Sequence, residues 1–461
     1  MIINLARRAH NHNWGLDPIT RSLLDTDFYK LLMLQFIWKH FPSTSATFSL
    51  INRSVDVRLA EMIDTGEVRE QLEQVRRLRF HKSELIWLAG NTFYGRRGIF
   101  EHRFLDWLER DFRLSDYELS VKDGQFSLQF HGAWKETTLW EIYALSIISE
   151  LKTRASMKRL SEFELDILYA RAKTRLWEKM ARLRGVPGLS VSDFGARRRH
   201  SYLWQEYVVK AMSDVLGDVF KGTSNTYLAY KHDLEAIGTN AHELPMAMAA
   251  MATSDAELQG SQYRFLELWQ QTYQGELLIL LPDTFGTTQF LGNAPKWVAS
   301  WTGQRGDSKD PFTAGDEYIR WLERNEQDPR HKLFIASDGL EVENILRLHA
   351  YFSGTIRAGG KPADFRTAED FLDERKWTPE RRIRFSAGWG TLLTNDFRNC
   401  NPLGDGGFDP VSLVCKLNDA DGRPAVKLSD NFDKALGPAE EIARYRKIFG
   451  SEGVAHSPVV T

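Results

Sequence analysis

The sequence predicts an α/β protein in two parts: a (βα) barrel in the middle of the chain and an α+β domain built from both ends. Between residues 189 and 388, short strand-like runs recur, each followed by a polar or glycine-bearing loop and a helical pattern, as in parallel α/β domains. Strand runs joined by tight-turn sequences flank this region on both sides. We expect an α+β domain at 1–155, joined by 405–461, and a barrel at 156–404.

Composition indicates a globular enzyme-sized protein. The chain has 461 residues, 42% of them hydrophobic, which suits a large core. With 60 basic and 62 acidic residues the net charge is -2, so neither nucleic acid nor a membrane surface is indicated as a partner. No apolar run approaches the roughly 18 residues of a membrane span. The start of the chain lacks the apolar core of a secretory signal. The two cysteines form no CxxC pair, which favours a reducing compartment, so we expect a cytoplasmic protein.

The first part of the chain alternates helices and strands. The first 20 residues read as a loosely structured arm. A helix is predicted over 29–38, capped by Asp25 or Thr26, followed by a strand over 46–51 and helical segments within 56–90. The runs 117–121 and 126–130 flank the turn Lys122–Gln125 and predict a hairpin. A long amphipathic helix over about 138–154 follows.

The barrel is predicted from repeated strand–loop–helix units after a helical stretch at 160–184. The strand runs are 189–195, 218–224, 236–239, 276–283, 297–302, 332–339 and 382–388. About seven units fit a barrel better than an open sheet, and loops after barrel strands carry the chemistry. The last part predicts strands at 411–417 and 425–428, joined by the turn 418–422 and packed on the first domain. Residues from 451 on are expected to fray.

Two glycine-bearing loops are candidate sites for a phosphorylated sugar. Gly388 and Gly390 allow successive backbone N–H groups to face one ligand, and Thr391 adds a hydroxyl at the next helix start, which suits a terminal phosphate. A tight turn is the alternative. In the loop at 337–340, Asp338 suits sugar hydroxyls and Gly339 allows close approach, although Asp338 could equally cap the next helix.

Charged residues at other strand ends point to anions. Arg305 offers a planar fork for a carboxylate, a phosphate or an aromatic face, and Asp307 could accept hydroxyls or help hold Mg²⁺; a surface ion pair is the alternative. Phe194 offers an aromatic platform. Arg197 follows it at a helix start, where a cation opposes the helix dipole, so an anionic partner is indicated. Lys221 reads as a further anion contact.

One histidine lies in a turn of small residues just before a helix. Gly238 and its neighbours let the backbone approach a ligand closely, and His242 beside the helix start could meet a phosphate. An ordinary hydrogen-bonding histidine is the alternative. Asp283, after another strand, reads as a hydroxyl or metal partner. Together these loops suit a phosphorylated sugar and a flat anion.

These motifs, in order and spacing, resemble those of the nicotinate phosphoribosyltransferase family. They are Thr26–Lys30, Asp193–Arg197, Phe220–Thr223, Gly238–His242, Pro282–Asp283, Arg305–Ser308, Ser337–Gly339 and Ser386–Thr391. The resemblance implies the type II phosphoribosyltransferase fold, an irregular barrel with an α+β domain from both termini, and a homodimer with sites at the interface. It also implies the first step of NAD salvage from nicotinate. In that reaction nicotinate, 5-phosphoribosyl-1-pyrophosphate (PRPP), ATP and water give nicotinate mononucleotide, pyrophosphate, ADP and phosphate.

The resemblance also implies roles for single residues. Tyr29, from the partner subunit, and Phe194 would sandwich the pyridine ring, with Arg305 at the ring or its carboxylate. His242 would be phosphorylated by ATP, which makes His242, Arg305 and Asp307 the catalytic candidates. The other implied positions are Asp338, Gly339, Gly388, Gly390 and Thr391 at the ribose and 5-phosphate; Arg197, Lys221 and Asp307 at the pyrophosphate; and Asp27, Thr223, Ser224, Asp283 and Ser337 elsewhere in the substrate site. Mg²⁺ would be held mainly through PRPP or pyrophosphate, with Asp283 or Asp307 as candidate protein ligands.

Three alternatives stay open. In the related nicotinamide enzyme an Asp follows the Phe-Lys-Gly-Thr run, whereas Ser224 here can donate to a carboxylate and favours nicotinate. A quinolinate-using enzyme shares the barrel, but a shorter chain would be expected. A non-catalytic nucleotide sensor would not need His242, Arg305 and Asp338 together. The sequence shows no Walker-type loop, so ATP is expected to share the PRPP pocket.

Overall fold

The computed structural model describes residues 17–456. Most of the arm predicted over the first 20 residues therefore lies outside the described residues. Within the described residues, no helix is both long enough and apolar enough to cross a membrane.

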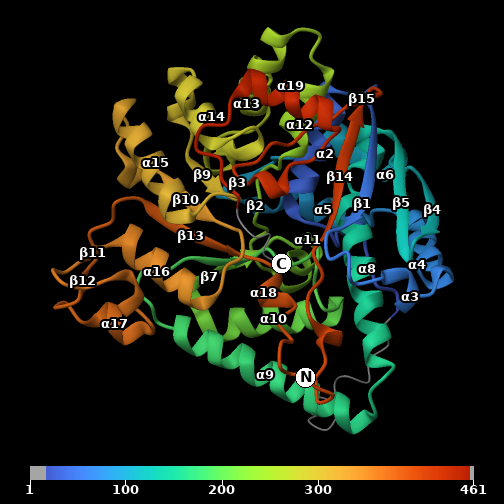
Figure 1. Ribbon diagram of the computed structural model, residues 1–461, viewed down its shortest axis with the longest axis horizontal. Coiled ribbons are helices and arrows are strands. Elements are labelled where there is room, and N and C mark those ends of the chain that lie inside the picture. The colour runs from blue at the N-terminus through green and yellow to red at the C-terminus, as the bar shows by residue number, and fades with distance from the viewer. Residues whose placement is uncertain (1–16, 457–461) are drawn as a thin grey trace.

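A five-stranded antiparallel sheet brings the two ends of the chain together on one side of the molecule (Figure 1). Its strand order is β15-β14-β1-β5-β4, with β1 at Ser45–Asn52, β4 at Asp116–Lys122, β5 at Gln125–Ala133, β14 at Leu413–Ala420 and β15 at Arg423–Pro424. Strand β1 pairs with β5 on one side and with β14 on the other. The C-terminal strand thus packs on the N-terminal sheet, as the sequence predicts.

The predicted hairpin is confirmed. Strands β4 and β5 pair from Asp116↔His131 to Lys122↔Gln125. The two loop residues, Asp123 and Gly124, have φ angles of 51° and 74°, which is the backbone shape that a two-residue hairpin turn requires.

Seven helices in the described part of the chain accompany this sheet. They are α2 (Phe28–His40), α3 (Leu59–Met62), α4 (Thr65–Arg77), α5 (Lys82–Gly90), α6 (His102–Arg110), α7 (Trp134–Thr137) and α8 (Trp140–Met157). Among them, α3, α7 and α8 pack directly against the strands of the sheet. A small hairpin, β2 (Thr92–Phe93) and β3 (Arg96–Arg97), lies between α5 and α6. The helices predicted around 29–38, 56–90 and 138–154 are confirmed, with boundaries shifted by a few residues.

Helix α2 is buried on all sides from Phe28 to Ile37. Its sequence is apolar around most of the helix, which is typical of a buried helix. The buried ammonium of Lys30 pairs with Glu141 at 2.7 Å and with Glu243, so the buried charge is compensated. The position before the helix is Asp27 rather than the predicted Asp25 or Thr26.

The middle of the chain forms six parallel strands in the order β7-β6-β13-β10-β9-β8. Their bounds are β6 Val191–Asp193, β7 Phe220–Thr223, β8 Ile279–Leu280, β9 Gly303–Gly306, β10 Leu333–Ala336 and β13 Arg384–Trp389. The helices are α9 (Glu162–Leu183), α10 (Tyr202–Leu216), α11 (Thr226–His232), α12 (Glu243–Met251), α13 (Asp255–Thr272), α14 (Thr287–Asn293), α15 (Pro311–Arg324), α16 (Val342–Ser353), α17 (Ala368–Leu372) and α18 (Thr391–Thr394). A hairpin of β11 (Thr355–Ile356) and β12 (Trp377–Thr378) projects beside α17 (Figure 1).

The segment after α11 bridges the two edges of this sheet. Ala236 forms an isolated parallel bridge with Thr223 of β7, and the Asn240 side chain donates to the carbonyl of Ile279 in β8 at 2.8 Å. The run predicted as a strand at 236–239 therefore contributes a single bridge. The result is the irregular α/β barrel that the sequence predicts.

One strand prediction is wrong. Residues 297–302 lie largely in a 3-10 helix, Lys296–Ser300, and the strand is β9 at Gly303–Gly306. The β-prone Trp and Val residues suggested the strand, but only a glycine fits at position 303, because a Cβ there would lie 2.3 Å from the Leu333 carbonyl oxygen.

The C-terminal hairpin is also shifted. Strand β14 runs on to Ala420, the turn is Asp421–Gly422, and residues 425–428 follow β15 instead of forming the second strand. The chain end expected to fray from 451 is ordered as far as His456: Ala455 exchanges backbone hydrogen bonds with Asp430 and Phe432. Helix α19 (Ala439–Phe449) lies between these segments.

Backbone hydrogen bonds join the N-terminal part of the chain to the barrel. The Phe28 N–H donates to the Ser224 carbonyl at 2.7 Å, and the Tyr227 N–H donates to the Leu24 carbonyl at 2.8 Å. A buried, two-pronged ion pair joins Arg199 to Asp25, at 2.7 and 2.8 Å. This docking brings the start of α2 to the carboxyl ends of the barrel strands.

Candidate active site

Two adjoining cavities lie where the barrel strands end, against β14. They share five lining residues: Phe194, Arg197, Arg305, Asp307 and Lys416. We call them the aromatic cavity, also lined by Tyr29, Phe48, Tyr94, Ser224 and His242, and the cationic cavity, also lined by Arg53, Arg198, Asp338, Lys427 and Lys434. Both contain residues from the barrel and from the terminal segments of the same chain.

Aromatic rings form the walls of the first cavity. Tyr29 enters from the start of α2, and Phe194 follows strand β6. The structure therefore places Tyr29 in the cavity of its own chain, which corrects the prediction that it arrives from a partner subunit. The reason is the docking described above, which fixes Asp27 and Phe28 directly against Ser224.

Gly388 has a different role from the predicted one. It lies within β13, paired with Ser192, and a Cβ on it would lie 2.3 Å from Cε2 of Phe194. Its missing side chain makes room for the Phe194 ring, and it lines neither cavity. Gly390 and Thr391 do line the cationic cavity, at the start of α18.

Gly388→Ala is therefore expected to displace Phe194, lowering stability by about 1–3 kcal/mol through overpacking and raising KM for the aromatic substrate. Urea unfolding and steady-state kinetics measure the two effects. The matched control is Gly390→Ala, whose Cβ would meet nothing closer than 3.8 Å and should leave stability within about 0.5 kcal/mol. Equal stability losses in both variants would contradict the assignment.

A buried carboxylate lies at the floor of the aromatic cavity. Asp27 accepts a hydrogen bond from the Ser224 hydroxyl at 2.5 Å and lies 3.8 Å from Arg197. Burial raises the pKa of Asp27 to about 6, although Arg197 opposes the shift. The Ser224 proton is thus already engaged by Asp27, so it is not free for a substrate carboxylate. Ser224 therefore does not favour nicotinate in the way that the sequence suggests.

The cationic cavity gathers seven basic side chains: Arg53, Arg197, Arg198, Arg305, Lys416, Lys427 and Lys434. Only two aspartates, Asp307 and Asp338, line it, and Asp338 pairs with Lys434. Such an excess of positive charge suits phosphate groups. Ser337 and Gly339 line this cavity as well.

Several of these cations escaped the sequence analysis because they come from the terminal segments. Arg53 follows β1, Lys416 lies in β14, and Lys427 and Lys434 follow β15. Arg198, beside Arg197, was also missed. A signal existed: Lys416 and Lys427 each interrupt an apolar run, Val414–Leu417 and Ala425–Leu428, where a buried lysine needs an anionic partner.

Arg305 lies in β9 between the two cavities. Its guanidinium makes one long contact, 3.4 Å to the Asn240 carbonyl, and its buried Nε has no hydrogen-bond partner among the described residues. A buried donor without a partner is costly. Arg305 can therefore bind an anionic group of a ligand in either cavity.

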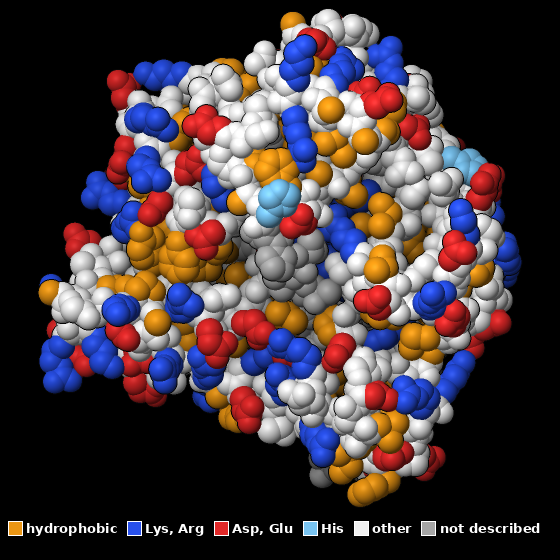
Figure 2. Space-filling view, in the orientation of Figure 1, with side chains coloured by type: hydrophobic (Ala, Val, Ile, Leu, Met, Phe, Trp, Pro, Cys, Tyr) orange, Lys and Arg blue, Asp and Glu red, His pale blue; other side chains and the backbone are white. Residues whose placement is uncertain are grey.

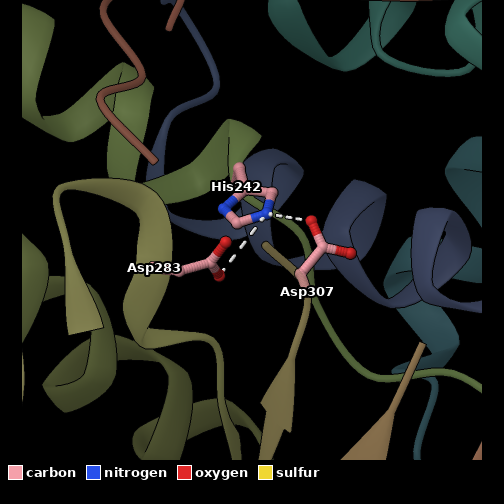
Figure 3. Close-up of side chains that lie close together, drawn as sticks. All are labelled: His242, Asp283 and Asp307. Atoms are coloured by element: carbon pink, nitrogen blue, oxygen red, sulfur yellow. Dashed lines mark hydrogen bonds and ion pairs between the residues drawn. The ribbon is translucent and has the colours of Figure 1, made fainter. Parts of the chain in front are cut away.

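His242 lies beside the carboxylates of Asp283 and Asp307 (Figure 3), and an ammonium contacts it as well. Its Nε2 lies 3.1 Å from Asp307 and 3.8 Å from Asp283, and the Lys427 Nζ is 3.0 Å from the same nitrogen. Its Nδ1 contacts the Thr284 hydroxyl at 2.9 Å. Burial lowers the pKa of His242 to about 4, and the Lys427 charge adds to this. The imidazole is therefore neutral at pH 7 and keeps a nucleophilic lone pair.

Asp307 stays ionised beside it. Burial opposes ionisation, but the hydrogen bond with His242 and the charge of Lys427 hold the pKa of Asp307 well below its usual value. Asp283 is buried next to the cationic cavity and accepts from the Ser308 hydroxyl at 2.5 Å. These two carboxylates and His242 place one ligand atom each within 4.8 Å of one another.

The chemistry of this set fits Mg²⁺ only in part. Two carboxylates are hard oxygen donors, as Mg²⁺ prefers. However, Lys427 lies within 4 Å of His242, Asp283 and Asp307, where it competes with a cation held by protein ligands alone. An ion shared with substrate phosphates is compatible with this arrangement.

Two predicted contacts lie outside the cavities. Lys221 is exposed on β7, and its Nζ donates to the Asp218 carbonyl; because side chains alternate along a strand, it points away from the site. Thr223 is buried and donates to Asp193 at 2.7 Å, which makes it a support for the β6–β7 junction. The structure therefore does not bring either residue together with the other candidate site residues.

On the face seen in Figure 2, basic and acidic side chains are interspersed. This pattern agrees with the near-zero net charge of -2. The cationic cavity differs from this face in having seven basic and two acidic lining residues, and an excess of positive charge confined to a cavity suits a small anion.

Comparisons with known proteins identify relatives. The family model described as the nicotinate phosphoribosyltransferase (NAPRTase) family matches residues 189–360, and the model of the NAPRTase N-terminal domain matches residues 24–149. The structure is similar to a nicotinate phosphoribosyltransferase from Vibrio cholerae, with 29% identity and a TM-score of 0.79 over 95% of each chain. It is also similar to one from Porphyromonas gingivalis, with 27% identity and a TM-score of 0.75 over 94% of this chain and 100% of that one.

Proposed function

Because the chain belongs to the nicotinate phosphoribosyltransferase family, we propose that it transfers the phosphoribosyl group of PRPP to nicotinate and couples this transfer to ATP hydrolysis through His242. The observation that carries the proposal is the junction of the two cavities. A cavity walled by aromatic rings meets one rich in cations, and Arg197, Arg305 and Lys416 belong to both. A flat anion and a polyphosphate would meet there with their reacting atoms adjacent.

In the transfer step, the pyridine nitrogen of nicotinate attacks C1 of the ribose, the bond from C1 to the pyrophosphate oxygen breaks, and pyrophosphate leaves with the electron pair. Displacement at such a carbon passes through a cation-like state. The nitrogen carries no proton to remove, so no general base is needed. The protein orients the partners and stabilises the leaving anion, which the tightly gathered cations can do.

Phe194 and Tyr29 supply the rings that would hold the pyridine, and Arg305 the fork that would meet its carboxylate or the pyrophosphate. Ser337, Gly339, Gly390 and Thr391, at the ends of β10 and β13, would hold the 5-phosphate and, with Asp338, the ribose. Asp283 and Asp307 would contact a Mg²⁺ ion bound mainly by the phosphates. The ion would neutralise charge on the departing pyrophosphate.

The ATP step would form and break one bond each. With the ring proton on Nδ1, where it faces the Thr284 hydroxyl, His242 Nε2 attacks the γ-phosphorus of ATP, the bond to the bridging oxygen breaks, and ADP leaves. Water later cleaves the N–P bond and releases phosphate. The neutral imidazole and the ammonium of Lys427, 3.0 Å away, support this role. The phosphoryl group would add negative charge beside the PRPP site and order it.

Nicotinate is favoured over nicotinamide by Arg305 rather than by Ser224. Arg197 faces Asp27 and Glu141 in the aromatic cavity, whereas Arg305 makes one long contact and can pair with a substrate carboxylate, which an uncharged amide does not need. A quinolinate-using enzyme and a non-catalytic nucleotide sensor remain as alternatives to be separated by experiment. The homodimer also stays a prediction.

The direct test incubates the purified chain with PRPP, Mg²⁺ and ATP, and with labelled nicotinate, nicotinamide or quinolinate in turn. Nicotinate mononucleotide should form, and ADP should appear in step with it. Product from nicotinamide or quinolinate at equal kcat/KM would overturn the substrate assignment. Product without any ADP would leave the transferase assignment standing but refute the coupling.

PRPP binding is expected to weaken as pH rises through about 8. Burial lowers the pKa of Lys416 to about 8, although Glu141 opposes the shift. Below that pH the ammonium attracts phosphate, and above it the charge is lost, so KM for PRPP should rise severalfold, by up to about tenfold for one charge-assisted contact. Steady-state kinetics from pH 7 to 9 measure this. In Lys416→Met the step should vanish and KM should be high throughout; an unchanged step would assign it to another group.

A further inference from the structure

The small hairpin β2–β3 reaches from the N-terminal part of the chain to the segment that carries His242. Its turn residue Tyr94 has a φ angle of 50°, a left-handed conformation that is uncommon for a residue with a side chain. Tyr94 also lines the aromatic cavity. Strained backbone of this kind persists where surrounding contacts hold it in place.

Tyr94 forms hydrogen bonds with two residues of the segment that leads to His242. Its backbone N–H donates to Oε1 of Glu235 at 2.7 Å. Its hydroxyl accepts from the Gly238 N–H at 2.6 Å and donates to the Gly238 carbonyl at 3.2 Å. One tyrosine therefore satisfies both backbone groups of a buried glycine four residues before His242.

The other side of Gly238 is closed by Tyr29. A Cβ on Gly238 would lie 2.9 Å from the Tyr29 backbone nitrogen, and the glycine has a φ angle of 152°. Gly238 is thus held between Tyr29, which walls the aromatic cavity, and the hydroxyl of Tyr94. Two N-terminal elements, the start of α2 and the β2–β3 hairpin, fix the segment that bridges the barrel edges.

We propose that Tyr94 is a positioning residue for the His242 loop: its hydroxyl clamps Gly238 so that His242 is presented to the phosphate site, while its ring closes the aromatic cavity. The inference rests on the proposed role of His242. It assigns separate tasks to the two parts of one side chain, the hydroxyl to the ATP-coupled step and the ring to binding of the pyridine substrate.

The two tasks can be separated by substitution. Tyr94→Phe keeps the ring and removes the hydroxyl that hydrogen-bonds to Gly238. It should leave KM for nicotinate within twofold, but lower the amount of phosphate bound to the protein, and the ADP formed per mononucleotide, at least fivefold. Tyr94→Ala should in addition raise KM for nicotinate at least tenfold. Glu235→Gln weakens the hydrogen bond from the Tyr94 N–H and should lower phosphorylation in the same direction as Tyr94→Phe.

A readout that does not involve ATP keeps this test independent of the proposed function. Amide hydrogen exchange of the 236–242 segment in the free protein should quicken at least tenfold in Tyr94→Phe. The matched control is Tyr263→Phe, which removes a similar half-buried bond, 2.7 Å to the Phe290 carbonyl, away from both cavities. It should change neither exchange at 236–242 nor coupling.

The outcomes are distinct. Unchanged exchange and unchanged coupling in Tyr94→Phe would overturn the clamp. A wild-type protein that takes up no phosphate would refute the proposed coupling, while faster exchange in Tyr94→Phe would still establish that the hydroxyl fixes the loop. A rise in KM for nicotinate as large in Tyr94→Phe as in Tyr94→Ala would contradict the division between hydroxyl and ring.

Discussion

Arg305→Ala should lower kcat/KM for nicotinate and PRPP by at least about 100-fold, because it removes a charged donor from the place where charge develops in the transfer step. Arg305 lies in both cavities, and its buried Nε lacks a partner among the described residues. Removing it therefore breaks few contacts within the protein, so the loss should be catalytic rather than structural. Arg305→Lys keeps the charge but loses the planar fork and should recover only a small part of the activity.

Steady-state kinetics with each substrate varied in turn measure this prediction, and thermal unfolding confirms that the variant is folded. Arg182→Ala is the control, because Arg182 forms an ion pair with Glu343 at the protein surface. Such pairs contribute little, so that variant should keep its kcat/KM. A folded Arg305→Ala protein with wild-type kcat/KM would remove Arg305 from the proposed site.

His242→Ala should abolish stable phosphate incorporation from γ-labelled ATP and uncouple ATP hydrolysis, while some basal transfer survives at a higher KM for PRPP. The physical reason is that the imidazole contacts Asp307, Lys427 and Thr284 but is not among the residues that line the cationic cavity. Its loss removes the phosphoryl acceptor and leaves the cations that bind PRPP. Without the phosphoryl group that is proposed to order the PRPP site, KM for PRPP should rise by roughly tenfold or more.

Acid-labile label on the intact protein and the ratio of ADP to mononucleotide measure the effect. His232→Ala is the matched control, because His232 pairs with Glu206 on α10 and lines neither cavity. It should take up label as the wild type does. Label that persists in His242→Ala would place the phosphate elsewhere, and complete loss of transfer in a folded variant would make His242 essential to the transfer itself.

Most elements of the fold could be predicted from local patterns. The hairpin at 117–130 was visible because Asp123-Gly124 is a two-residue turn sequence between alternating runs. The buried α2 was visible from its apolar sequence. The strand at 303–306 was missed because its residues, Gly-Gln-Arg-Gly, have little strand preference; close packing against β10 selects them.

The site was predictable where a motif lies at the end of a barrel strand. His242, Arg305, Asp307 and the loops at 337–339 and 390–391 all reach the cavities. The Lys221 side chain lines neither cavity, because side chains alternate along a strand and a shift of one residue reverses the face to which each side chain points. The packing role of Gly388 was not predicted, because the sequence could not show that the Phe194 ring fills the space beside it.

By itself, the sequence determined the class of fold, the family and the chemical kinds of residue at the strand ends, because these depend on local periodicity and on motif order. Only the tertiary structure decided which residues share a cavity. It placed Tyr29 against its own barrel, gave the Ser224 proton to Asp27, and brought Lys416 and Lys427 from the far end of the chain beside His242 and Arg305. These contacts join residues up to about 200 positions apart, and the packing of β14 on β1 and of α2 on the barrel creates them.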